Sequence, residues 1–234
     1  MGGCTTIQKQ RRSKSKFFMT ITTLQDLRAL YAPARERSVK KQMPSLDVHA
    51  TRFIGLSPLV VVASAGMDAA AGLLDASPRG GAPGFVKVMD AHTLLIPDAP
   101  GNNRLDSLEN IVLTGHIGLL FLLPGVDETL RVNGTAVLST SAEDIARCTD
   151  EKRAPKLVIR VTVQAAYLHC AKALMRSNLW SHEVQVSRSV MPSMGEMMKD
   201  QIGGDIPAET QEQMLAASTP LKNPGKSHEH WLLV

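Results

Sequence analysis

Short apolar runs, separated by glycine and proline, characterise the chain from about residue 53 onwards. Residues 59–65 form a valine-rich run, and residues 117–123 form a second apolar run of similar length. Residues 156–167 alternate between apolar and polar side chains, as expected for a long strand with one buried face. These lengths and periods predict β-strands, since buried helices need longer periodic segments.

A hairpin and a longer strand complete the predicted sheet. Residues 84–89 and 93–97 are expected to form two strands joined by a short turn. Residues 128–138 form a longer strand, in which the Asn133-Gly134 pair predicts a β-bulge. The glycine-, alanine- and aspartate-rich residues 66–83 are expected to form a loop or the rim of a ligand site.

Helical periodicity is confined to short segments. Residues 104–112 carry leucine, isoleucine and valine at helical spacing, with Asn102 or Asn103 placed to cap the helix. Ser141 is expected to begin another helix, and Thr23 to cap one in a polar N-terminal segment that packs across the outside of the main domain. Short helices between strands, without a regular βαβ rhythm, predict a mainly β, antiparallel barrel.

The 234 residues allow one large domain, with segments of different character on either side of it. We expect a disordered basic leader at 1–19, a helical segment at 20–50 and the barrel domain at 51–200. Residues 201–234 are expected to form an extension that packs on the domain or is partly disordered.

The net charge of +4 comes from the N-terminal segment. Residues 1–18 hold five basic residues and no acidic ones, whereas the rest of the chain has 21 basic and 22 acidic residues. A near-neutral globular part argues against binding to a nucleic-acid backbone. The basic segment itself fits either a disordered leader or, with its Met-Gly-Gly-Cys start, a myristoylated contact with a membrane surface.

Composition also limits the location and the chemistry. No apolar run reaches the length of about 18 to 20 residues that crosses a bilayer, so no membrane span is expected. The three cysteines form no CxxC pair, and this sparse, odd count favours the reducing cytoplasm. The seven histidines lack the HxxxH and HExxH spacings, so no metal site is expected.

Basic and amide side chains gather around the predicted hairpin. Lys87 lies on its first strand, and Arg79 lies in a flexible turn upstream. A glycine-containing turn after the second strand leads to Asn102, Asn103 and Arg104 at a helix start. A phosphate monoester needs about two cations together with amide donors, which a helix N-terminus supplies. These residues therefore fit a phosphate site, and their spacing alone also fits solvated charges beside a helix cap.

The same stretch resembles the pyridoxamine 5′-phosphate oxidase-like flavoproteins, most closely the branch of FMN-dependent PPOX-type proteins. The resemblance covers roughly residues 50–200 and is most specific in the middle. It is carried by five motifs: GFVK (84–87), LLIPD (94–98), GNNR (101–104), LLFLLPG (119–125) and ETLRVNG (128–134).

This resemblance implies a six-stranded antiparallel split β-barrel with peripheral α-helices, which forms a homodimer. Two FMN molecules would lie in clefts at the dimer interface, each phosphate held by Lys87, Asn103 and Arg104. The oxidase itself has a second cation in the turn where this chain has Asn103, so Arg79 is expected to supply the missing charge.

The resemblance also adds further residues to the predicted cofactor site, some near the phosphate and some near the flavin ring. Asn102, together with Val86 and Pro97 on the hairpin strands, completes the binding set near the phosphate. Thr129 and Arg131 lie on the strand that faces the flavin ring in the family. The C-terminal Arg-x-His pair that binds substrate in the oxidase has no counterpart, so no catalytic residue is assigned.

The leading hypothesis is therefore an FMN-dependent oxidoreductase that acts on an unidentified small molecule, with an unknown electron donor. One alternative is a flavin-binding or redox-sensing module without turnover. Another is the same barrel with F420 or haem as its ligand. We expect a cytoplasmic homodimer with neither a nucleic-acid partner nor a membrane span.

Overall fold

The computed structural model describes residues 20–66, 74–99, 101, 103–150 and 153–204. The chain divides into two compact units, with the boundary between Ala171 and Lys172. The predicted domain boundaries at residues 19, 50 and 200 stay predictions. Among the described residues, no helix is long and apolar enough to cross a membrane.

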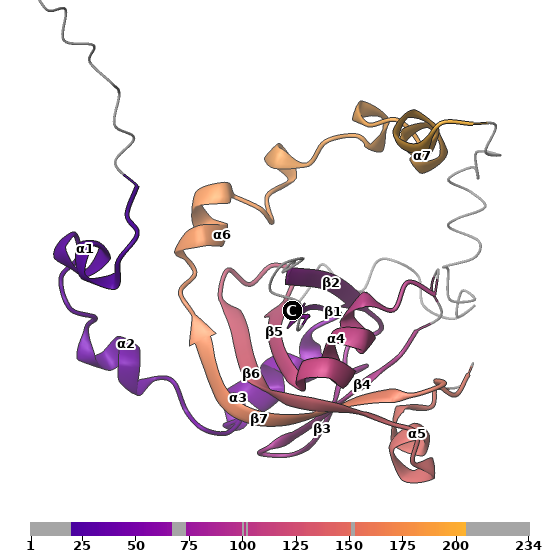
Figure 1. The fold of residues 1–234 in the computed structure, drawn as a ribbon, viewed down its shortest axis with the longest axis horizontal. Helices are drawn as coiled ribbons and strands as arrows, with labels where there is room; N and C mark the ends of the chain where they lie inside the picture. Colours follow the sequence, from indigo (N-terminus) through magenta and orange to yellow (C-terminus); the bar gives the residue numbers. More distant parts are fainter. Residues whose placement is uncertain (1–19, 67–73, 100, 102, 151–152, 205–234) are drawn as a thin grey trace, which may run out of the picture. The chain divides into compact units, whose positions relative to one another are not determined.

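The first unit is built on one antiparallel sheet (Figure 1). Its strands are β1 (Leu59–Ala65), β2 (Leu74–Gly80), β3 (Lys87–Asp90), β4 (Thr93–Pro97), β5 (His116–Leu122), β6 (Thr129–Ser139) and β7 (Val158–His169). Their order in the sheet is β2-β1-β5-β6-β7-β4-β3, so β2 and β3 are the edge strands among the described residues. A sheet with two edges suits a split barrel, and the predicted mainly β, antiparallel class is confirmed.

In the part of the chain that the structure describes, the sheet has seven strands, so the predicted count of six is wrong. The additional strand is β2, which lies in the segment 66–83 that was expected to be a loop or rim. It pairs with β1 along its whole length. Its inward positions are polar, which removes the apolar alternation that marks a strand, and Pro78 is tolerated because β2 is an edge.

Among the described residues of the first unit, five helices accompany the sheet. They are α1 (Leu24–Ala29), α2 (Glu36–Lys40), α3 (Val48–Leu56), α4 (Asp106–Thr114) and α5 (Ala142–Cys148). The predicted caps at Thr23 and Ser141 are confirmed, since each side chain accepts a bond from a backbone N–H three residues on. No residue of α1 or α2 is buried.

The core lies on the inner face of the sheet and is closed partly by α3. Phe121, Leu94 and Leu130 are fully buried there, and α3 adds Phe53 and Ile54. The sequence predicted strand character from about residue 53, and this start is wrong because α3 runs to Leu56. Its cap at Asp47, which accepts a 2.7 Å bond from Ala50 N, was not recognised.

The predicted hairpin and bulge are both present. In the turn between β3 and β4, the Asp90 carboxylate accepts a 2.7 Å bond from His92 N, which lowers the pKa of Asp90. The β6–β7 register shifts between Asn133 and Gly134. A Cβ at Gly134 would lie 2.0 Å from Thr162 O, so the close approach of β7 requires glycine there.

The second unit contains α6 (Lys172–Ser177), the 3₁₀ turns η1 (His182–Val184) and η2 (Arg188–Val190), and α7 (Met194–Ile202). Ser193 and Glu196 form a reciprocal capping box at the start of α7. Among residues 172–204, most apolar side chains are exposed, including Met191, Met194 and Met198.

Candidate cofactor site

Two cavities with shared walls lie in the first unit, and together they are called the cleft below. The larger has a volume of about 860 Å³ and the smaller about 220 Å³. The residues that line both are Arg79, Gly80, Asp98, Ala99, Arg153 and Pro155. This size is ample for a cofactor such as a flavin mononucleotide.

Three segments build the larger cavity. Strand alternation points Asp75, Ser77 and Arg79 of β2 to one side, where all three line it. The start of α4 and residues 153–157, which lead into β7, form the other walls. Ser107 on α4 donates a short hydrogen bond to the Asp75 carboxylate, which ties this helix to β2.

Lys87 begins β3 and lines the smaller cavity. Its Nζ donates a 2.8 Å hydrogen bond to Gly84 O, a neutral partner, and no ion pair found among the described residues includes Lys87. Cys148 at the end of α5 lines the same cavity. Burial raises the pKa of the Cys148 thiol, although the nearby Lys87 charge acts in the opposite direction.

Arg79 is held by its own strand. Its Nη1 donates a 2.7 Å hydrogen bond to Ser77 Oγ, again a neutral partner. Because Arg79 lines both cavities, it is the predicted cation that joins the Lys87 side of the cleft to the α4 side.

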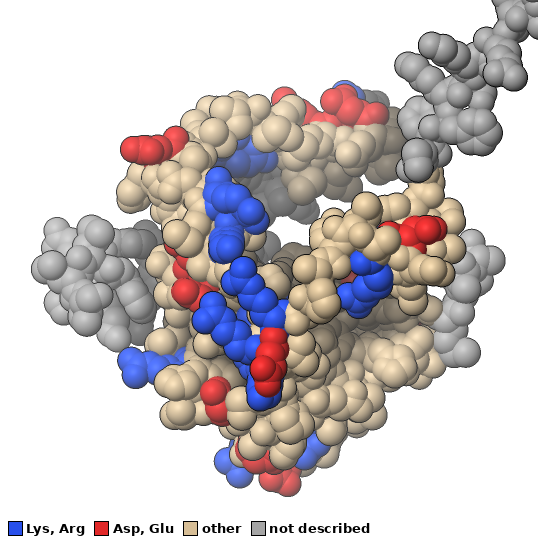
Figure 2. Space-filling model, turned by 90° about the vertical axis from the view of Figure 1, so that its left-hand side faces the viewer, with Lys and Arg blue, Asp and Glu red and all other residues tan. Residues whose placement is uncertain are grey.

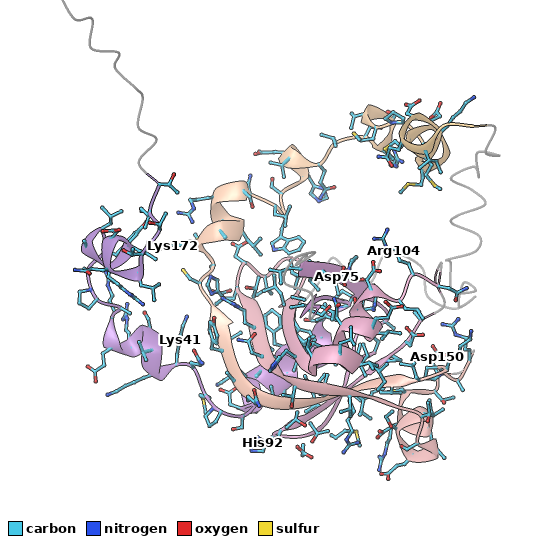
Figure 3. The ribbon with its side chains drawn as sticks, in the orientation of Figure 1. Lys41, Asp75, His92, Arg104, Asp150 and Lys172 are labelled. Carbon is cyan, nitrogen blue, oxygen red and sulfur yellow. The ribbon has the colours of Figure 1, made fainter. Side chains whose placement is uncertain are left out.

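Asn103 and Arg104 line the larger cavity at the approach to α4. The Arg104 guanidinium lies 2.5 Å from the Asp106 carboxylate, and this bond raises the pKa of Arg104. Figure 3 labels Arg104 and Asp75, which share this cavity. Asn103 has a left-handed φ of +58°, a conformation that asparagine tolerates better than most residues.

The expected capping role of Asn103 is wrong. The N-cap of α4 is Leu105, which makes no side-chain capping bond, because the left-handed turn at Asn103 places the helix start two residues later. The other predicted cap, Asn102, lies outside the described residues.

Three predicted residues do not line the cleft. Val86 is 2% exposed and belongs to the apolar core, so its side chain is directed away from both cavities. Thr129 and Arg131 lie on β6 and line neither cavity. Pro97, at the end of β4, does line the smaller cavity.

Two basic residues that precede β7 also line the cleft, and neither was predicted from the sequence. Arg153 lines both cavities and Lys156 lines the larger one. The backbone at Arg153 is fixed by a 3.0 Å bond from its N–H to the Asp150 carboxylate. The only signal in the sequence is two cations around a proline, Arg-Ala-Pro-Lys, directly before a strand.

The cleft mixes charges of both signs. Its basic residues are Arg79, Lys87, Arg104, Arg153 and Lys156, and its acidic residues are Asp75, Asp98, Asp106 and Asp150. Three of the carboxylates accept hydrogen bonds within the chain: Asp75 from Ser107, Asp106 from Arg104 and Asp150 from the backbone N–H of Arg153. Within the described ranges, no group of three or more His, Cys, Asp or Glu could hold a metal ion.

The family model for pyridoxamine 5′-phosphate oxidase matches residues 46–170, which is more than half of the chain and includes the whole sheet. The chain belongs to the pyridoxamine 5′-phosphate oxidase family. This is a family of flavin-binding oxidoreductases. No curated protein matches the sequence of this family member significantly.

Several solved structures are similar to this pyridoxamine 5′-phosphate oxidase family member at low identity. HupZ of Group A Streptococcus is 17% identical, with a TM-score of 0.43, over 53% of this chain and 93% of its own. An FMN-binding protein from Syntrophomonas wolfei is 12% identical, with a TM-score of 0.40, over 53% and 86%. A Clostridium acetobutylicum protein of the pyridoxinephosphate oxidase family, related to general stress protein 26 of B. subtilis, is 10% identical, with a TM-score of 0.40, over 52% and 86%.

Proposed function

We propose that this chain binds FMN with the phosphate group in the cleft and acts as an FMN-dependent oxidoreductase on a small molecule. The observation that carries the proposal is the convergence of Lys87, Arg79 and Arg104 on two cavities with shared walls. FMN, when bound, supplies the hydride or electron transfer, and the protein supplies binding and electrostatics.

The donor set fits a phosphate monoester. Such a group carries a charge near −2 and is best held by two cations with additional N–H donors. Lys87 and Arg79 both line the smaller cavity; Lys87 donates to Gly84 O, and Arg79 donates to Ser77 Oγ and Pro78 O, which are all neutral oxygens. Neither takes part in the ion pairs found among the described residues. Asn103 and Arg104, and in the sequence Asn102, would add donors on the α4 side.

The ring side of the proposed site requires a second copy of the chain. Thr129 and Arg131 are proposed to face the flavin ring, but one chain does not bring them into the cleft. Strand alternation directs both to the face of the sheet opposite the core, where Arg131 is exposed and Thr129 is buried, and the register aligns Val61, Leu120 and Arg131 across β1, β5 and β6. A homodimer formed through this partly apolar face would bring the cleft of one copy toward the β6 of the other.

The proposal is tested first by a spectrum. Purified protein, or protein titrated with FMN, should show the absorbance of bound oxidised flavin. A Soret band would indicate haem, and a single deazaflavin band would indicate F420. A colourless protein that gains no flavin signal on addition of FMN would contradict the proposal.

Turnover and assembly need separate measurements. Consumption of NAD(P)H by the yellow protein would distinguish an enzyme from a flavin-binding module. Light scattering should give the mass of a dimer. The unpaired Cys148 and Cys170 fit the cytoplasmic location that we propose.

A further inference from the structure

A second group of basic side chains lies outside the cleft, around Tyr167. Arg131 on β6 and Tyr167 on β7 are directly opposed in the register, and both belong to the outer face. The Arg131 guanidinium carbon lies 5.4 Å from the centre of the Tyr167 ring, within the range of a cation–π interaction.

Lys41 brings a second positive charge to the same ring. Its Nζ lies 5.6 Å from the Tyr167 ring centre and donates a 2.9 Å hydrogen bond to Leu168 O. Two residues further along, Met43 exchanges backbone hydrogen bonds of 2.9 and 2.8 Å with Ala166. The N-terminal segment is therefore anchored along β7, and Figure 3 labels Lys41 at this anchor.

His169 completes the group, which we call the Tyr167 cluster: Lys41, Arg131, Tyr167 and His169. The His169 ring lies 6.2 Å from the Tyr167 ring at an interplanar angle of 54°. In the register His169 is opposite Thr129, the other residue proposed to face the flavin ring. The cluster thus offers nitrogen donors from three side chains and a phenol hydroxyl.

The charges of the Tyr167 cluster are not balanced by carboxylates. No ion pair found among the described residues includes Lys41 or Arg131. Two like charges beside one aromatic ring repel each other, and an anion bound next to them would offset that repulsion. The face of the molecule in Figure 2 shows Lys and Arg side chains gathered in a band, with a few acidic side chains beside them.

We propose that the Tyr167 cluster binds the acidic group of a small organic anion, a carboxylate or a phosphate. Arg131 donates from a planar fork that suits such groups, and Lys41 adds a point charge from the anchored N-terminal segment. Because Arg131 is also proposed to face the flavin ring, an anion bound by the cluster would lie beside that ring. The proposal therefore includes the class of substrate: the molecule that reacts beside the ring is an organic acid. That last step rests on the proposed FMN function, whereas anion binding itself does not.

Benzoate is a suitable probe, with benzamide as its uncharged counterpart. The full-length protein is titrated with each compound by calorimetry, both with FMN and without it. We expect saturable binding of benzoate and none of benzamide. Binding of both compounds with equal affinity would overturn the proposal, because the site would then recognise the ring and not the charge.

Lys41→Gln tests the site without touching Arg131, which is also assigned to the cofactor. We expect benzoate affinity to fall about tenfold or more, the scale of one charge-assisted hydrogen bond. Lys40→Gln is the matched control, since Lys40 is the neighbouring lysine and pairs with Glu36 in α2. It should bind benzoate as the parent does. Equal benzoate affinity in Lys41→Gln and the parent would overturn the proposal.

Three further measurements distinguish failure of the anion-site proposal from failure of the cofactor proposal, from misfolding of the variant and from an effect on the dimer. The dissociation constant for FMN should be the same in Lys41→Gln and the parent, and loss of FMN binding in the parent itself would refute only the cofactor proposal. Matching thermal unfolding curves show that Lys41→Gln is folded. If Lys41→Gln weakens the dimer and the parent binds no benzoate, a carboxylate of the second copy fills the site and the proposal is wrong.

Discussion

The cleft and the Tyr167 cluster are both rich in basic side chains, but the two regions hold them differently. In the cleft, Lys87 and Arg79 donate to neutral oxygens of residues one to three positions away in the chain, and both side chains line a walled cavity. In the Tyr167 cluster, Lys41 and Arg131 lie by an aromatic ring on the outer face of the sheet. The walled cleft suits a resident cofactor, whereas the open cluster suits a ligand that comes and goes.

The largest expected effect comes from the strand that carries Arg131. Gly134→Ala would place a Cβ 2.0 Å from Thr162 O, a backbone atom of β7 that has little room to move. We expect the free energy of unfolding to fall by about 3 kcal/mol or more, measured by urea denaturation. Gly55→Ala is the control, because a Cβ there meets nothing within 4 Å and alanine favours the helix α3.

Such a loss would damage the Tyr167 cluster before the cleft, since β6 and β7 carry Arg131 and Tyr167. Equal unfolding curves for Gly134→Ala and the parent would contradict the described bulge.

Lys87→Met should affect the cleft alone. Removing one charge-assisted bond to the phosphate is expected to weaken FMN binding by about 1.5 to 3 kcal/mol, measured by quenching of flavin fluorescence. Benzoate binding should not change. Lys40→Met provides the control, since Lys40 is exposed and lies outside the cleft. An unchanged FMN affinity in Lys87→Met would remove Lys87 from the site.

Arg104→Ala should have a smaller effect than Lys87→Met. Its side chain is 77% exposed and already bonded to Asp106, so part of its interaction with a phosphate is offset. We expect a loss of about 1.5 kcal/mol in FMN binding, the lower end of the range for a charged hydrogen bond. If Arg104→Ala lost more FMN binding free energy than Lys87→Met, the phosphate would have to lie closer to the start of α4 than proposed.

The smallest effect concerns two thiols, one in the cleft and one beside the Tyr167 cluster. Cys148 lines the smaller cavity, and burial raises its pKa, whereas Cys170 is exposed next to His169 of the Tyr167 cluster. Because the thiolate is the reactive form, iodoacetamide at pH 8 should label Cys170 about tenfold faster or more. Raising the pH should speed up the labelling of Cys148, since it ionises later. If peptide mapping gave equal labelling rates for Cys148 and Cys170, the smaller cavity would be open to solvent.

The cleft was easier to predict from the sequence than the Tyr167 cluster, for a physical reason. Lys87, Arg79 and Arg104 lie close together in the chain, so a hairpin and one helix start are enough to bring them together. Lys41 and Leu168 are separated by 127 residues, and no local pattern connects them. Arg131 was singled out only through the family resemblance, and its contact with Tyr167 depends on the β6–β7 register.

The strands differ in the same way: those with a local apolar pattern were predicted, and one without such a pattern was missed. The apolar run of β1 and the turn-bounded β4 were predicted with the observed limits. Their apolar side chains become buried, and this burial leaves a visible apolar pattern in the sequence. Strand β2 was missed because backbone pairing with β1, and not apolar burial, makes it a strand. Arg153 was missed because nothing local indicates that the segment before β7 borders the β2 side.

The central claim, that the cleft holds the phosphate of FMN, is tested most directly by comparing FMN with riboflavin. The two ligands share the flavin ring and the ribityl chain, and only FMN carries the phosphate. We predict that FMN binds about 100-fold more tightly in a fluorescence titration, the scale of two charge-assisted hydrogen bonds, and that Lys87→Met narrows this difference. Equal affinities for FMN and riboflavin would contradict the claim.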